Sequence, residues 1–262
     1  MSSYKVILFV FLILILIPSF FHCIFYNRVR KLKKTPFINN KNMIVVTTTM
    51  PNNIISDKRR NNIVKMFSDQ KVSILLNHGI SKKDNNKLSI HDIMFLTIKN
   101  SIELFNKTSF EYAIICDDDF FPINNFIEEL NKTVQLLPND WRSLHLCPGY
   151  LWGREFRDES KIGSLNIESS IDVTDMDYHE SGRFYLNCNG KLNASRKMWL
   201  GGPIAFLIKK EYSTQFLREF TERFKKIKEP NDVILTKMLT KKDFICRSPQ
   251  LGYEKEEGGT TL

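Results

Sequence analysis

Cysteine is scarce in this sequence, and its cysteines are widely spaced. The 262 residues include five cysteines, and no two of them form a C-x-x-C pair. Zinc modules built on thiolates need such closely spaced ligands, so a zinc site is not expected. Whether the four cysteines after residue 36 form disulfides depends on the redox compartment, and the spacing leaves this open.

Acidic residues are absent from the first 36 positions. The net charge of +9 comes from 38 basic and 29 acidic residues, and six of the basic ones lie in this acid-free segment. The excess over the remaining chain is small, so charge predicts no nucleic-acid partner. The run "RVRKLKK" at 28–34 instead predicts either a membrane-proximal stop or a contact with anionic lipid.

Charge is also absent from residues 6–26, "VILFVFLILILIPSFFHCIFY". This stretch can cross a hydrocarbon core of about 30 Å. A cleaved signal peptide is the alternative, but its apolar part usually spans roughly 7–15 residues and precedes a small-residue cleavage site that is missing here. The sequence therefore predicts one transmembrane helix that serves as an anchor.

We expect four segments along the chain: a short tail at 1–5, the transmembrane anchor at 6–26, a basic stem at 27–42 and one α/β domain at 43–262. The basic residues after the anchor favour a cytosolic domain. The enzyme class suggested below more often faces a lumen, so the orientation stays open. The predicted location is a single-pass protein of a Golgi- or ER-type membrane, or of a viral or host membrane.

Strand-like and helix-like segments alternate in the expected domain. Apolar, β-branched runs predict strands at 43–49, 72–76, 112–116, 141–147 and 203–211, and helical periodicity predicts helices at 56–70, 89–107, 126–137, 212–227 and 231–242. Residues 149–197 show little periodicity and are expected to form loops. This order predicts a mostly parallel sheet with helices on both faces, in which ligands bind beyond the carboxyl ends of the strands.

Three aspartates follow the strand predicted at 112–116, in "YAIICDDDFFP". Asp117 and Asp119 suit a hard divalent cation such as Mn²⁺ or Mg²⁺, which prefers oxygen ligands and keeps positions open for phosphates. A plain acidic turn is the alternative. A haloacid-dehalogenase-like phosphatase is disfavoured, because Phe121 stands where that motif needs Thr or Val.

Two other motifs carry weaker signals. Gly201 and Gly202, in "WLGGPIAFLIKK", would let a ligand approach the backbone closely, although a tight turn needs glycine just as much. Asp232, in "EPNDVIL", stands where a helix is expected to begin, and a helix cap is the simpler interpretation. His91 falls within an expected helix, where a packed or surface histidine is usual.

Taken in order, these pieces resemble glycosyltransferase family 25, the lipopolysaccharide and collagen galactosyltransferase-like enzymes. The resemblance rests on "IVVTTT…DKRRNNIVKMF", "LSIHDIMFLTIKNSIELF…YAIICDDDFFP", "LLPNDWRSLHL", "GGPIAFLIKK" and "EPNDVIL". In this alignment His91 matches a family histidine, and the aspartates match an E-D-D motif. The departures are Asp117 in place of Glu, Gly202 in place of Thr, and Ile90 between Ser89 and His91.

The resemblance implies a GT-A-like (Rossmann-like) fold and transfer of a hexose from a nucleotide-sugar, with UDP-sugars expected, to a hydroxyl of a glycan, lipid or protein. It also implies Mn²⁺ or Mg²⁺ on Asp117 and Asp119, with Asp118 supporting the nucleotide. Gly201 and Gly202 would line the donor site, and Asp232 would be the base of an inverting reaction. A sugar nucleotidyltransferase and a non-catalytic, membrane-tethered nucleotide-sugar or glycan-binding relative remain as alternatives.

Overall fold

The computed structural model describes residues 36–50, 53–81, 85–147, 181–185, 205–246 and 251–254. The chain divides into two units, Met1–Pro36 and Phe37–Leu262, and all the structural findings below concern the second. The anchor predicted at 6–26 lies outside the described residues. Within those residues, no helix is both long enough and apolar enough to cross a membrane.

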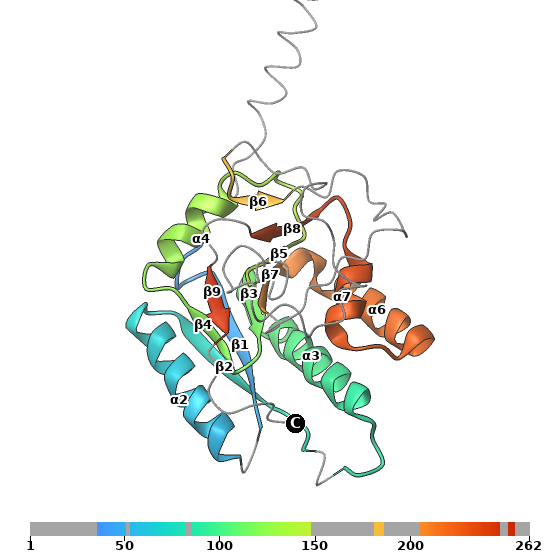
Figure 1. Cartoon of the computed structure of the whole chain (residues 1–262). Coiled ribbons are helices and arrows are strands. Elements are labelled where there is room, and N and C mark those ends of the chain that lie inside the picture. Colours follow the sequence, from blue (N-terminus) through green and yellow to red (C-terminus); the bar gives the residue numbers. More distant parts are fainter. Residues whose placement is uncertain are drawn as a thin grey trace, which may run out of the picture. The chain divides into compact units, whose positions relative to one another are not determined.

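A seven-stranded sheet forms the centre of the second unit (Figure 1). Its strands, in spatial order, are β2 (Ser73–His78), β1 (Met43–Thr49), β3 (Tyr112–Cys116), β7 (Ala205–Lys209), β5 (Ser143–His145), β8 (Asp243–Cys246) and β6 (Phe184–Tyr185). The pairings of β7 and β6 are antiparallel and the other three are parallel, so all strands except these two run in one direction. The predicted mostly parallel α/β sheet is confirmed, with the antiparallel β7 inserted between β3 and β5 and the antiparallel β6 at one edge.

Helices cover both faces of this sheet, as predicted (Figure 1). One apolar cluster joins the sheet to α3 (Ile90–Asn106), α6 (Lys210–Ile227) and α7 (Asn231–Met238), and a second joins it to α2 (Ile54–Asp69) and α4 (Phe126–Val134). Strand β3 shows why: Ala113 and Ile115 belong to the first cluster, whereas Ile114 and Cys116 belong to the second. Because every residue of β3 is apolar, both faces of the strand exclude water.

Some boundaries differ from the prediction. Helix α2 begins earlier than expected, because its cap is Asn53, whose side chain accepts hydrogen bonds from the N–H groups of Ile55 and Ser56. Pro122 does not simply break the chain: it ends strand β4 (Phe120–Pro122), which pairs with β9 (Gly252–Glu254) in a separate two-stranded sheet. Strands β4, β8 and β9 were not predicted, since each is only three or four residues long.

The three helices on the face of the first apolar cluster, α3, α6 and α7, alternate in direction along the sheet. The Lys210 ammonium, at the start of α6, donates to the carbonyls of Phe105 (2.6 Å) and Thr108 (2.9 Å), at the end of α3. At the other end, His91 Nδ1 lies 3.1 Å from the carbonyl oxygen of Lys228, just past α6. Helix α3 leads from the carboxyl end of β2 to the amino end of β3, so α6 ends at the carboxyl edge of the sheet and α7 begins there.

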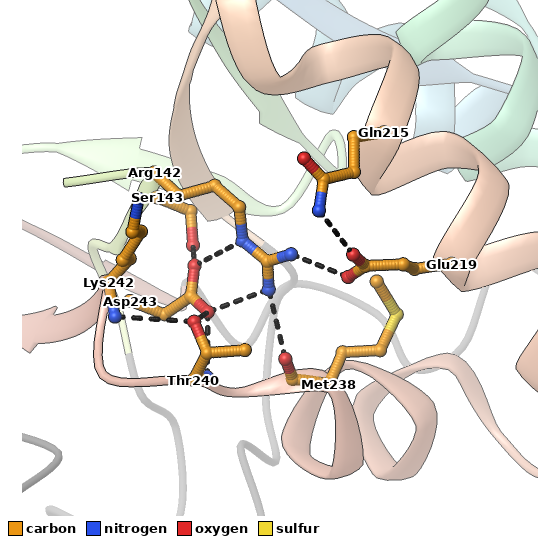
Figure 2. Close-up of polar contacts among 8 residues, drawn as sticks. All are labelled: Arg142, Ser143, Gln215, Glu219, Met238, Thr240, Lys242 and Asp243. Atoms are coloured by element: carbon orange, nitrogen blue, oxygen red, sulfur yellow. Dashed lines mark hydrogen bonds and ion pairs between the residues drawn. The ribbon is translucent and has the colours of Figure 1, made fainter. Parts of the chain in front are cut away.

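A buried ion pair joins the amino ends of β5 and β8 (Figure 2). Arg142 donates to both carboxylate oxygens of Asp243 (2.9 and 2.7 Å), to the Met238 carbonyl (2.9 Å) and to Glu219 (2.5 Å). Asp243 also accepts from the Ser143 hydroxyl and from the N–H and hydroxyl of Thr240. Neither charge is left unsatisfied, although both are almost completely buried.

Three described cysteines, Cys116, Cys147 and Cys246, are buried, and Cys116 and Cys246 are free thiols. Burial raises the pKa of the Cys116 and Cys246 thiols far above its ordinary value. These thiols therefore act as small apolar side chains of the core.

We predict that Asp243→Asn lowers the free energy of unfolding by about 3–5 kcal/mol, because it leaves the buried Arg142 guanidinium without a counter-charge. Glu219→Gln neutralises the other carboxylate that pairs with this arginine; the Glu219 side chain is 31% exposed, so its substitution should cost less than about half as much. Urea unfolding of both variants measures the difference. Equal losses would contradict the role given to Asp243.

Candidate active site

The three aspartates form a turn between β3 and β4, at the carboxyl edge of the sheet. The N–H of Phe120 donates to the Asp117 carbonyl across this turn (3.3 Å). Beyond the turn, β4 is held by β9, where Gly252 faces the Phe120 ring. A Cβ on Gly252 would lie 2.1 Å from that ring, so only glycine permits this approach. The aspartate turn therefore lies between two strands that are both fixed by pairing, β3 with β1 and β4 with β9.

Asp118 points back toward the start of α2. The Ser56 hydroxyl donates to Asp118 Oδ2 and itself accepts from the N–H of Met50 (2.8 Å). Both side chains are buried, with Asp118 at 5% exposure. One hydroxyl therefore connects the end of β1, the first turn of α2 and the aspartate turn.

Arg59, one turn further along α2, supplies the positive charge among the carboxylates. Its NH1 nitrogen lies 3.7 Å from Asp118 Oδ1 and 3.8 Å from Asp119 Oδ2. Arg59 is almost completely buried. Repulsion between neighbouring carboxylates needs such a counter-charge, but one guanidinium does not neutralise two aspartates.

Asp119 is the less satisfied of the two carboxylates that face Arg59. Its Oδ1 atom is buried and has no hydrogen-bond partner among the residues that the structure describes. Burial and the nearby charge of Asp118 raise the pKa of Asp119, and Arg59 opposes this only in part. Burial likewise raises the pKa of Asp118, against the effect of Ser56 and Arg59. The turn favours additional positive charge.

The neighbouring strand ends are polar as well. Thr47 and Thr49, at the end of β1, have buried hydroxyls without a hydrogen-bond partner in the described part of the chain. Asn77, on β2, is buried and donates to the Thr97 carbonyl (2.9 Å) and the Ser101 hydroxyl (2.8 Å). Buried polar atoms without partners are rare in folded proteins, and these atoms make the carboxyl edge a candidate ligand site.

The aspartates do not form a closed metal cage. Within the described ranges, no three His, Cys, Asp or Glu side chains are placed so that they could together hold an ion. A cation here would therefore take part of its ligands from Asp119 and Asp117, and the rest from water or phosphate oxygens. The unpartnered Oδ1 of Asp119 is a hard oxygen donor of the kind that Mg²⁺ and Mn²⁺ prefer, so the residues fit such an ion.

Of the other predicted residues, Asp232 and His91 lie in the described part of the chain. Asp232 is half-buried in the first turn of α7, which begins at the same carboxyl edge as the aspartate turn. Its Oδ1 accepts from the N–H of Val233 (2.8 Å), a local contact typical of a helix start. His91 joins α3 to the end of α6 and has a structural role there. Gly201 and Gly202 lie outside the described residues.

The sequence prediction placed neither Ser56 nor Arg59 in the site: Ser56 was a candidate helix cap, and Arg59 was only part of the basic helix start quoted for the resemblance. Both lie in the "SDKRR" stretch of α2, the helix that follows the first strand, where basic residues are unremarkable because most of them face water. The available signal was position: this helix follows β1, and β1 pairs with β3, the strand that precedes the aspartates. Only the fold shows that Arg59 points inward while its neighbour Arg60 pairs with Asp57 (2.8 Å) at the surface.

No protein-family model matches this sequence, and no curated protein is detectably similar to it. Among solved structures, the chain is similar to a glycosyltransferase involved in the glycosylation of the major capsid of PBCV-1. The two share 9% sequence identity with a TM-score of 0.39, over 71% of this chain and 68% of the other. At this level the similarity assigns neither a family nor an activity.

We predict that Asp119→Asn raises the midpoint of thermal unfolding at pH 7, measured with EDTA present. The raised pKa of Asp119 means that its charged form is disfavoured in the folded state. Below the ordinary value of 3.8 the group is protonated whether folded or unfolded, so the gain should vanish there and grow as the pH rises through the raised pKa. Asp57→Asn, on the partly exposed outer side of α2, is the control. A loss of stability in Asp119→Asn at pH 7 would contradict the description of this site.

Proposed function

We propose that this protein is a membrane-anchored, metal-dependent glycosyltransferase with a GT-A-like domain. It would transfer a hexose from a nucleotide-sugar, a UDP-sugar by expectation, to a hydroxyl of a glycan, lipid or protein. The observation that supports this most directly is the buried oxygen of Asp119 beside Arg59, at the carboxyl end of a central strand, which has no hydrogen-bond partner among the described residues. Open α/β sheets bind their ligands at such a place.

Asp117 and Asp119 are the residues that would hold Mn²⁺ or Mg²⁺, whose charge stabilises a departing nucleoside diphosphate. Asp118 takes a supporting role, because its carboxylate is already occupied by Ser56 and Arg59. These contacts determine how the turn presents Asp119. Preorganised charge of this kind, directed at the leaving group, supplies a large share of catalysis in many enzymes.

Asp232 is the proposed general base. It would take the proton from the acceptor hydroxyl while that oxygen forms a bond to the anomeric carbon, and the bond from this carbon to the diphosphate would break with inversion. A base must lie within hydrogen-bond reach of the hydroxyl. The start of α7 at the carboxyl edge supports this assignment, and Gly201 and Gly202 are retained as donor-site residues by resemblance alone.

We predict that the full chain, purified in detergent, releases nucleotide from one donor in a panel of UDP-, GDP- and CMP-sugars, and that release requires Mn²⁺ or Mg²⁺. Asp119→Ala should lower the rate by about 10²–10³-fold or more while the protein remains folded, because the cation loses its best-placed ligand. Asp57→Ala, which removes a carboxylate from the outer side of α2, should leave the rate unchanged.

Turnover by Asp119→Ala at the normal rate would rule out the metal role. Donor binding without release or transfer would identify a non-catalytic nucleotide-sugar-binding protein instead. Consumption of a nucleoside triphosphate with release of pyrophosphate would identify a sugar nucleotidyltransferase.

A further inference from the structure

Asn131 and Asn231 are buried to the same extent, each at 2% exposure, but their side-chain amides are paired differently. Asn131 accepts from the N–H of Ile38 (2.8 Å) and donates to the carbonyls of Ile38 (2.7 Å) and Ile127 (2.9 Å). It therefore ties α4 to the chain that leads into β1. Oδ1 of Asn231 is buried and has no hydrogen-bond partner among the described residues. No contact in this part of the chain gives the Asn231 amide a comparable role in the fold.

Asn231 is the first residue of α7 and lies on the buried side of this helix. Ile234, Leu235 and Met238 follow it at the spacings of one helical face, and they belong to the first apolar cluster. An apolar side chain at position 231 would complete this stripe by packing alone. The chain instead places an amide there, where α7 begins at the carboxyl edge of the sheet.

The chemistry of this helix start suits a neutral hydroxyl. The N-cap residue is Pro230, and no side chain caps the helix. Helix N-termini often bind anions, but the carboxylate of Asp232 beside the amide repels a phosphate group. A hydroxyl can donate to the amide oxygen of Asn231 or accept from its nitrogen, so it can pair with the amide in either orientation.

Asp232, the next residue in the chain, is the proposed base for the acceptor hydroxyl. An acceptor that brings this hydroxyl to Asp232 lies against the start of α7, where the Asn231 amide is the adjacent polar group. A saccharide carries several hydroxyls on one ring and can meet both residues at once. The single hydroxyl of a serine or threonine side chain can meet only the base.

We propose that Asn231 binds a second hydroxyl of the acceptor, next to the one that Asp232 deprotonates, and that the acceptor is therefore a saccharide. This role rests on the proposed function, since it assumes transfer with Asp232 as the base. Asn231 determines specificity: it orients the acceptor and takes no part in the proton transfer. A free sugar and the sugar of a glycoconjugate present the same ring hydroxyls.

The first test compares the thermal unfolding of Asn231→Leu and Asn131→Leu in the full chain without ligands. Leucine fills a similar volume and removes the amide. Asn131→Leu should lower the midpoint, because it leaves the N–H and carbonyl of Ile38 buried without their partner. Asn231→Leu should leave the midpoint unchanged or raise it, because it removes an unpaired buried amide. An equal fall in both variants would overturn the proposal, since the Asn231 amide would then serve the fold.

The second test measures nucleotide release from the active donor by the full chain in detergent. The acceptor probes are the methyl glycosides of galactose, glucose and mannose, and a serine-containing peptide. A glycoside should accelerate release, and Asn231→Leu should raise the KM for that glycoside by about 5–10-fold, as for one lost hydrogen bond, without changing the KM for the donor. Lys237→Gln, on the exposed side of α7, is the control and should leave both KM values unchanged.

Deoxy forms of the active glycoside identify the hydroxyl. One of them should show the same rise in KM with the unsubstituted protein and no further rise with Asn231→Leu. Asn231→Ala gives the same comparisons if Asn231→Leu does not fold.

Release that no glycoside accelerates, an unchanged glycoside KM in folded Asn231→Leu, or a raised donor KM instead would overturn the role of Asn231 alone. Absence of release from every donor by the unsubstituted protein, with and without acceptor, would overturn the proposed function and this role together.

Discussion

The carboxylate of Asp118 is buried beneath the first turns of α2, and the arrangement of the candidate site depends on how this charge is held. Ser56 binds it directly and Arg59 offsets it from 3.7 Å. Ser56 in turn is positioned by the cap at Asn53 and by the N–H of Met50 at the end of β1. Because Asp118 is held this way, the adjacent Asp119 remains beside Arg59, and one of its oxygens has no partner in the described part of the chain.

The two edges of the sheet therefore differ in how fully their buried charged groups are paired. At the amino edge, Arg142 and Asp243 satisfy one another and tie β5 to β8, which is a stabilising arrangement. At the carboxyl edge, Asp119 and the hydroxyls of Thr47 and Thr49 lack partners among the described residues. Unsatisfied polar groups are destabilising, and they are found where proteins bind ligands and carry out chemistry. Trp141 Nε1, at the amino edge, also lacks a partner among those residues, so it is the unsatisfied carboxylate of Asp119 that locates the candidate site.

The sequence predicted most of the regular fold because the signals are local. The apolar runs at Met43–Thr49 and Tyr112–Cys116 are strands with the expected bounds, and α3 lies within the predicted range. Strands β4, β8 and β9 were not predicted, because strands of three or four residues owe their existence to pairing rather than to local pattern. The antiparallel direction of β7 also depends on tertiary context, since strand direction leaves no mark on composition.

In the candidate site, too, some features follow from local sequence and others only from tertiary contacts. The aspartates were found from sequence because three charges after an apolar strand form an unusual local pattern. Ser56 and Arg59 were not, because their importance comes from the pairing of β1 with β3, which brings residues some 60 positions apart into contact. Whether a helical arginine faces water or a buried carboxylate is decided by that pairing and not by its neighbours in the chain.

The most direct test of the central claim is a crystal structure of the protein with Mn²⁺ and UDP, using the anomalous signal of manganese to locate the ion. We expect one peak in contact with the carboxylate of Asp119, present together with bound UDP. A manganese peak away from the aspartate turn, or UDP bound at this edge without manganese, would contradict the account.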